Sequence, residues 1–75
     1  MTNTNSFVCL QPSGHYGDQC KNKGYIKPNQ SFVIRYNEFI RFCNTGEVAK
    51  PVFVSDNYAD AIAEAKRLND LRQEA

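Results

Sequence analysis

The most reactive side chains of this sequence are one histidine and three cysteines. His15 lies in a glycine-containing segment, and Cys9 and Cys20 lie within six positions of it. A cysteine beside a histidine can act as a nucleophile, but that chemistry also needs a group that orients the histidine and donors that stabilise an oxyanion. The sequence has no motif for either. We therefore interpret His15 as an exposed loop residue and predict no catalytic residues.

The same residues could instead bind a metal ion. Cys9, His15, Cys20 and Cys43 would supply the four ligands of a tetrahedral zinc site. Zinc would also stabilise a small core and order the chain around it. However, the sequence lacks the closely spaced cysteine pair that is typical of structural zinc sites. We therefore predict no metal and no cofactor, and interpret the cysteines as small apolar residues.

Basic residues alternate with aromatic residues in the middle of the chain. Such surfaces bind single-stranded nucleic acid in some proteins, and Tyr and Arg are also enriched among the anchor residues of protein interfaces. The net charge of +1 provides no strong attraction to nucleic acid. We favour a partner-binding surface on a protein, with nucleic acid as the alternative. The predicted contact residues are Lys21, Lys23, Tyr25, Lys27, Arg35 and Arg41.

A single small domain, residues 1–75, must position these side chains. A core of this size is marginal and leaves little room for a substrate pocket, which argues against an enzyme. No apolar run approaches the roughly 20 residues needed to span a bilayer. Residues 1–6 are uncharged, unlike a signal peptide, and we expect them to be flexible. An odd number of cysteines fits a reducing compartment, so we predict a cytoplasmic protein without membrane contact.

The first half of the chain predicts a strand and a long loop. Phe7–Leu10 is a short apolar run typical of a strand. Glycine and proline recur from 11 to 30, which predicts a loop. Residues 31–43 are rich in aromatic and β-branched side chains and allow two interpretations, one amphipathic helix or two strands that meet at a turn. We prefer strands, because this composition suits a pleated surface.

The second half predicts a strand and a helix. Asn44-Thr45-Gly46 suits a turn closed by a left-handed glycine. A strand over 47–54 should then pair with 39–43, and Pro51 places it at the sheet edge or starts it. Potential capping residues at 55–57 predict a helix over 57–72. Its apolar stripe, which should face the sheet, is formed by Tyr58, Ala61, Ile62, Ala65, Leu68 and Leu71.

These elements predict an α+β fold, in which a three- or four-stranded, mostly antiparallel sheet carries one C-terminal helix on one face. The opposite face should be solvated and should carry the strand arginines. With Ile62 against the sheet, Ile62→Asp should unfold the domain, because burying an unpaired carboxylate costs several kcal/mol.

The stretch from Glu47 to Ala65 combines a predicted hairpin strand, a capped turn and an alanine-rich helix. It resembles small bacteriophage proteins that inhibit or redirect bacterial RNA polymerase, and other small phage proteins directed at host defence systems. The resemblance covers about a quarter of the chain. It implies an inhibitor or modulator of a host machine in the host cytoplasm, with RNA polymerase favoured. The alternatives are a small nucleic-acid-binding module and an inhibitor of a host defence nuclease complex.

Overall fold

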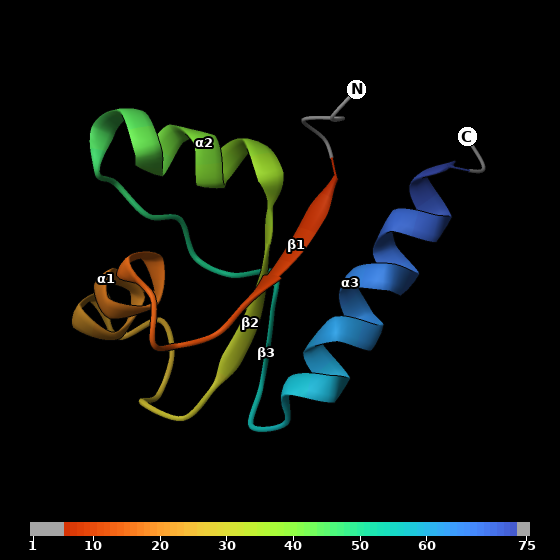
Figure 1. The fold of residues 1–75 in the computed structure, drawn as a ribbon, viewed down its shortest axis with the longest axis horizontal. Helices are drawn as coiled ribbons and strands as arrows, with labels where there is room; N and C mark the ends of the chain where they lie inside the picture. Colours follow the sequence, from red (N-terminus) through yellow and green to blue (C-terminus); the bar gives the residue numbers. More distant parts are fainter. Residues whose placement is uncertain (1–5, 74–75) are drawn as a thin grey trace.

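A computed structural model describes residues 6–73, in which strands and helices alternate along the chain. The elements are β1 (Phe7–Leu10), α1 (His15–Lys23), β2 (Ser31–Arg35), α2 (Tyr36–Thr45), β3 (Phe53–Ser55) and α3 (Tyr58–Gln73). The strands form one antiparallel sheet in the order β1-β2-β3 (Figure 1). The α+β class and the three-stranded antiparallel sheet are therefore confirmed.

Helices cover both faces of this sheet, with α3 on one side and α1 and α2 on the other (Figure 1). The central strand β2 explains this arrangement, because Phe32, Val33 and Ile34 are each at most 1% exposed. Phe32 and Ile34 pack toward α1 and α2, whereas Val33 packs against α3. A strand buried on both faces needs such a continuous apolar run. The prediction of a C-terminal helix on one face is confirmed by α3, but the prediction that it is the single helix and that the opposite face is solvated is wrong, because α1 and α2 cover that face.

Helix α1 occupies the middle of the loop predicted at 11–30, so that prediction is wrong. Tyr16 and Cys20 lie one helical turn apart and are buried against the sheet. Gly24 ends the helix in the left-handed conformation, with φ of 77°. Two lysines in the last turn and Asp18 in the first complement the helix dipole. The helix was missed because its other side chains are polar and its apolar stripe is very narrow.

Helix α2 replaces the second strand predicted within 31–43. The first strand is β2, but the chain enters α2 directly after Arg35. Phe39 and Phe42 lie three positions apart and pack onto the core through one helix face. Gly46 has the predicted left-handed conformation, with φ of 77°, but its N–H donates to the Phe42 carbonyl at 2.8 Å. It therefore ends a helix rather than closing a hairpin.

The strand predicted over 47–54 is shortened to β3. It pairs with β2, with Val54 opposite Phe32, rather than with residues 39–43, which are helical. Pro51 was predicted to place this strand at the sheet edge or to start it. β3 is indeed an edge strand, and it begins two residues after Pro51.

Helix α3 lies where it was predicted, and Asn57 caps it. The Asn57 Oδ1 accepts a hydrogen bond from the Ala59 N–H at 2.9 Å. Ala61 and Ala65 face Val33 of the sheet and are buried. Ile62 is instead 44% exposed, so the apolar stripe on the sheet is narrower than predicted.

Two further predictions concern the ends of the chain and the membrane. Residues 1–6, predicted to be flexible, lie outside the described residues except for Ser6, whose carbonyl accepts a hydrogen bond from the Tyr36 N–H at 2.7 Å. Among the helices of residues 6–73, none has both the length and the apolar character that crossing a bilayer requires.

Candidate functional site: a groove at the open edge of the sheet

Strand β1 forms one edge of the sheet, and only part of that edge is covered. The side-chain amide of Asn69 pairs with the backbone of Phe7, accepting from its N–H at 2.7 Å and donating to its carbonyl at 3.0 Å. Backbone groups of alternate residues point to the same side of an antiparallel strand. The N–H and carbonyl of Cys9 therefore point to this edge too, and no group within residues 6–73 hydrogen-bonds to them there.

One side of α3 follows this edge. Tyr58, Ile62 and Asn69 are separated by four and seven positions, so they share one stripe of the helix. Because Asn69 contacts Phe7, Ile62 lies about 10 Å further along the same edge and Tyr58 about 16 Å further. The rise along β1 is about 3.4 Å per residue, which places Ile62 near the end of the strand. Tyr58 and Ile62 are 42% and 44% exposed.

A cavity of about 590 Å³ opens beside the uncovered part of the edge. Its lining comes from residues of the segment 9–17, from Phe39 and Phe42 of α2, and from Tyr58 of α3. This volume is within the roughly 300–1,000 Å³ range of ligand pockets. We call this cavity, together with the exposed edge at Cys9 and the flanking Ile62, the β1 groove. It is bounded by apolar side chains on both sides of the sheet.

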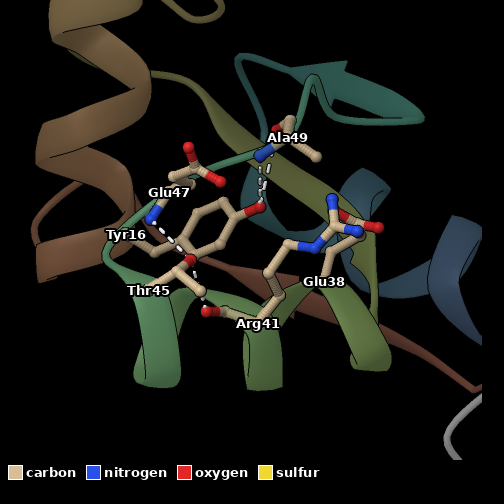
Figure 2. A network of polar contacts seen from close by, with 6 residues as sticks. All are labelled: Tyr16, Glu38, Arg41, Thr45, Glu47 and Ala49. Carbon is tan, nitrogen blue, oxygen red and sulfur yellow. Dashed lines mark hydrogen bonds and ion pairs between the residues drawn. The ribbon is translucent and has the colours of Figure 1, made fainter.

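Tyr16 fixes the α1 side of the groove. Its ring stacks on Phe39 with centroids 6.2 Å apart and meets Phe42 edge-on at 5.0 Å. Its hydroxyl accepts a hydrogen bond from the Ala49 N–H at 3.0 Å and lies 3.4 Å from the Ala49 carbonyl (Figure 2). Burial raises the pKa of Tyr16, so the hydroxyl stays protonated. These contacts hold helix α1 against α2 and against Ala49 in the segment that follows α2.

The turn after α2 is fixed by a second polar contact. The Thr45 hydroxyl donates to the Arg41 carbonyl at 2.9 Å and accepts from the Glu47 N–H at 3.2 Å (Figure 2). It thus pairs a carbonyl and an N–H group at the C-terminus of α2, where the helix itself leaves carbonyls without partners. The orientation of α2, and of the two phenylalanines in the groove, follows from this turn and from the Tyr16 contacts.

The structure brings two of the four potential metal ligands to the groove. Cys9 and His15 both line the groove. Cys20 is a buried residue of α1, and Cys43 is an exposed residue of α2. Within residues 6–73 no three histidine, cysteine or acidic side chains are grouped as metal ligands. Burial raises the pKa of Cys9, which favours the thiol over the nucleophilic thiolate.

The predicted partner-binding residues fall into two groups. Lys21, Lys23, Tyr25 and Lys27 lie on the last turn of α1 and on the connection to β2, and Lys21 pairs with an aspartate one turn earlier at 3.2 Å. Arg35 lies at the far end of β2, with its guanidinium 5.8 Å from the ring centroid of Phe7. Arg41 is on α2. These residues do not share one sheet face, because both faces are covered by helices.

None of those six residues lines the groove, and the residues that do were assigned to the core or to a loop. Leu10, Phe39 and Phe42 were expected to be sheet residues, and Tyr58 was expected to face the sheet. The spacing of Tyr58, Ile62 and Asn69 on one helical stripe was visible in the sequence. The pairing of that stripe with β1 was not, because it depends on strand order.

Comparisons of this chain with protein-family models, with curated proteins and with solved structures found no match.

Proposed function

We propose that this chain is a binding protein that attaches to a larger protein through the β1 groove and inhibits or modulates it. The proposed partner is a large bacterial protein complex, with RNA polymerase as the first candidate because of the resemblance of residues 47–65, of which the capped turn and the alanine-rich helix remain although the hairpin does not form. A host defence nuclease complex is the second candidate partner.

The observation that carries the proposal is the apolar character of an open surface. A domain of this size has few large apolar side chains, yet Tyr58 and Ile62 remain more than 40% exposed beside the apolar lining of the groove. Contiguous exposed apolar surface on a small soluble domain typically marks an interaction site. Tyr58 lines the cavity, and exposed aromatic side chains of this kind are frequent anchors of protein interfaces.

The basic residues have a secondary role in this proposal. Lys23, Lys27 and Arg41 are exposed around the α1 and α2 side of the molecule, so they are available to an acidic surface of the partner. Charges at the rim of an interface mainly affect the association rate and its salt dependence. A nucleic-acid module is less well supported, since no face of the sheet is open as a platform on which bases could stack.

The test combines capture and activity. Tagged protein is used to capture partners from a bacterial lysate, which mass spectrometry identifies, and purified protein is added to transcription by bacterial RNA polymerase. Ile62→Asp is expected to abolish capture and the effect on transcription. Ala63→Asp introduces the same charge at an exposed position about 100° around α3 from Ile62 and should retain both.

Each outcome has a defined meaning. If transcription is unaffected but another complex is captured through Ile62, the polymerase assignment fails and the binding function stands. If Ile62→Asp captures the same partner as the parent protein, the groove is not the binding surface. Charge reversal at Lys23 and Arg41 together then identifies the alternative surface. Direct binding to single-stranded nucleic acid with a steep salt dependence would replace the proposal by a nucleic-acid module.

A further inference from the structure

We infer that the ligand of the β1 groove is an extended peptide segment that adds to the sheet as a fourth strand, antiparallel or parallel to β1. This inference rests on the proposed function and specifies the chemistry of the partner segment. Its starting point is the N–H and carbonyl of Cys9, which have no hydrogen-bond partner within residues 6–73. Backbone groups at an exposed strand edge form a template for another extended chain.

Asn69 demonstrates that this edge accepts a peptide group. Its side-chain amide has the same donor and acceptor as a backbone amide, and it meets both groups of Phe7 at hydrogen-bond distance. Asn69 therefore stands where a neighbouring strand would lie, two residues before Cys9. A bound segment would continue this pairing at Cys9 and would end against Asn69. Since the chain turns toward α1 after Leu10, Cys9 supplies the main backbone contact.

The lining of the groove defines the side chains of the segment. Successive residues of an added strand point to opposite faces of the sheet. On one face they would meet Tyr58 and Ile62, and on the other they would meet Phe39 and Phe42. The side chains of α2 and α3 that flank the two faces are apolar or aromatic, so the segment is a short run of consecutive apolar residues rather than an alternating polar and apolar sequence.

A second copy of this chain fits the groove less well. The edge at Cys9 lines a cavity whose other walls are α1, α2 and α3, so it is recessed between helices. The same edge of another copy would carry its own flanking helices, which would meet these walls before the two strands could pair. A single extended segment has no such flanks. The occupant we infer is therefore a peptide segment of a different protein.

The experiment uses displayed random peptides, selected on the whole chain, and a synthetic copy of a selected peptide. Selected sequences should share consecutive apolar residues without a central proline. Binding of the synthetic peptide should slow amide hydrogen exchange at Cys9. Peptide copies methylated at one backbone nitrogen at a time should show one sensitive position, with binding weakened about tenfold or more, and insensitive neighbours. Loss of one well-formed hydrogen bond has an effect of this size.

Matched variants of the chain complete the test. Ile62→Asp should weaken peptide binding about tenfold or more, whereas Ala63→Asp should bind as the parent does. The inference is overturned if no peptide is selected, if N-methylation has no position-dependent effect, or if the protected amides lie elsewhere. Selection of a peptide that pairs with Cys9, without any effect on RNA polymerase, would support the inference and reject only the polymerase assignment. Capture of a partner through Ile62, without protection of Cys9, would support the proposed function and reject the inference.

Discussion

Gly17 is buried where α1 packs against Gln11 and Pro12, which connect β1 to α1, and the absence of a side chain permits that approach. A Cβ at this position would lie 2.6 Å from the Pro12 carbonyl oxygen and 2.8 Å from that of Gln11. Both contacts are with backbone, which cannot rotate away. Alanine normally stabilises a helix relative to glycine by about 1 kcal/mol. We nevertheless expect Gly17→Ala to lower the free energy of unfolding by about 1–3 kcal/mol, as overpacked cores do.

Thermal unfolding followed by circular dichroism measures this effect. The matched control is Gly14→Ala, because a Cβ at Gly14 meets nothing within 4 Å and the backbone there is extended. The melting temperature of the control should remain close to that of the parent. Equal melting temperatures for the two variants would show that Gly17 does not approach Gln11 and Pro12 as closely as described.

The hydroxyl group of Tyr16 joins α1 to Ala49, in the segment before β3. In Tyr16→Phe the ring contacts with Phe39 and Phe42 persist, but the Ala49 N–H loses its partner. We expect a loss of about 1–2 kcal/mol in the free energy of unfolding, measured by urea denaturation. Tyr25→Phe, which removes a hydroxyl for which no hydrogen bond is seen within residues 6–73, is the control and should be nearly neutral. A neutral Tyr16→Phe would contradict the role of this contact.

Cys20 makes the stability of the protein sensitive to alkaline pH. Burial raises the pKa of its thiol from 9.0 to about 11. The folded state therefore keeps the proton at pH values at which the unfolded state loses it, and stability falls as the pH rises from 9 to about 11. Denaturation curves at several pH values should show this decline, and Cys20→Ala should show less of it. An identical pH dependence in the two proteins would contradict the burial of the thiol.

At the scale of elements, α3 divides its apolar residues between the sheet and the groove. Ala61 packs against Val33 and is 0% exposed, whereas the next residue, Ile62, is 44% exposed. Ala61→Asp would bury an unpaired carboxylate at a cost of several kcal/mol, comparable to the whole stability of a small domain. We expect it to be unfolded by circular dichroism. Ile62→Asp should remain folded with a loss of roughly 1 kcal/mol, the average for single substitutions. A folded Ala61→Asp or an unfolded Ile62→Asp would contradict this orientation, in which Ala61 faces the sheet and Ile62 does not.

The elements that sequence could predict are those whose signals are local. Helix α3 has a capping residue, Asn57, and apolar residues at helical spacing, so its position follows from its own sequence. β1 is a short apolar run with a loop-like segment after it. Left-handed Gly46 was also predictable, although not whether it ends a helix or a hairpin.

The elements that sequence missed depend on contacts with distant residues. The aromatic composition of α2 favours a strand. The helical conformation is stabilised instead because it lets Phe39 and Phe42 pack on Tyr16, which lies more than 20 positions away. Helix α1 carries local signals, an acidic first turn and Gly24 after the last, but its buried stripe is too short to stand out. The groove was not predictable at all, because it forms between α1, α2, α3 and one sheet edge that only the topology brings together.

On the scale of the whole molecule, Asn69 closes the fold. It joins the last helix to the first strand across 62 positions of sequence, and it covers the Phe7 part of an edge that no other group of the described residues covers at Cys9. Strand edges without such protection pair with other chains and promote self-association. The same edge is left open at Cys9, so protection stops where the β1 groove begins. Asn69 therefore separates a protected part of the edge from the part that lines the β1 groove.

Asn69→Ala should have two effects, one on stability and one on association. Loss of the two hydrogen bonds to Phe7 should lower the free energy of unfolding by about 1–3 kcal/mol, and the Phe7 amide should exchange its hydrogen faster. Because the uncovered edge then extends from Phe7 to Cys9, the variant should also pair with a selected peptide at one more backbone position, which peptides methylated at single backbone nitrogens would detect. Asn22→Ala, at an exposed position of α1, is the control and should behave as the parent in all measurements. If Asn69→Ala exchanges the Phe7 amide no faster than the parent, Asn69 does not cover the edge, and the boundary of the groove lies elsewhere.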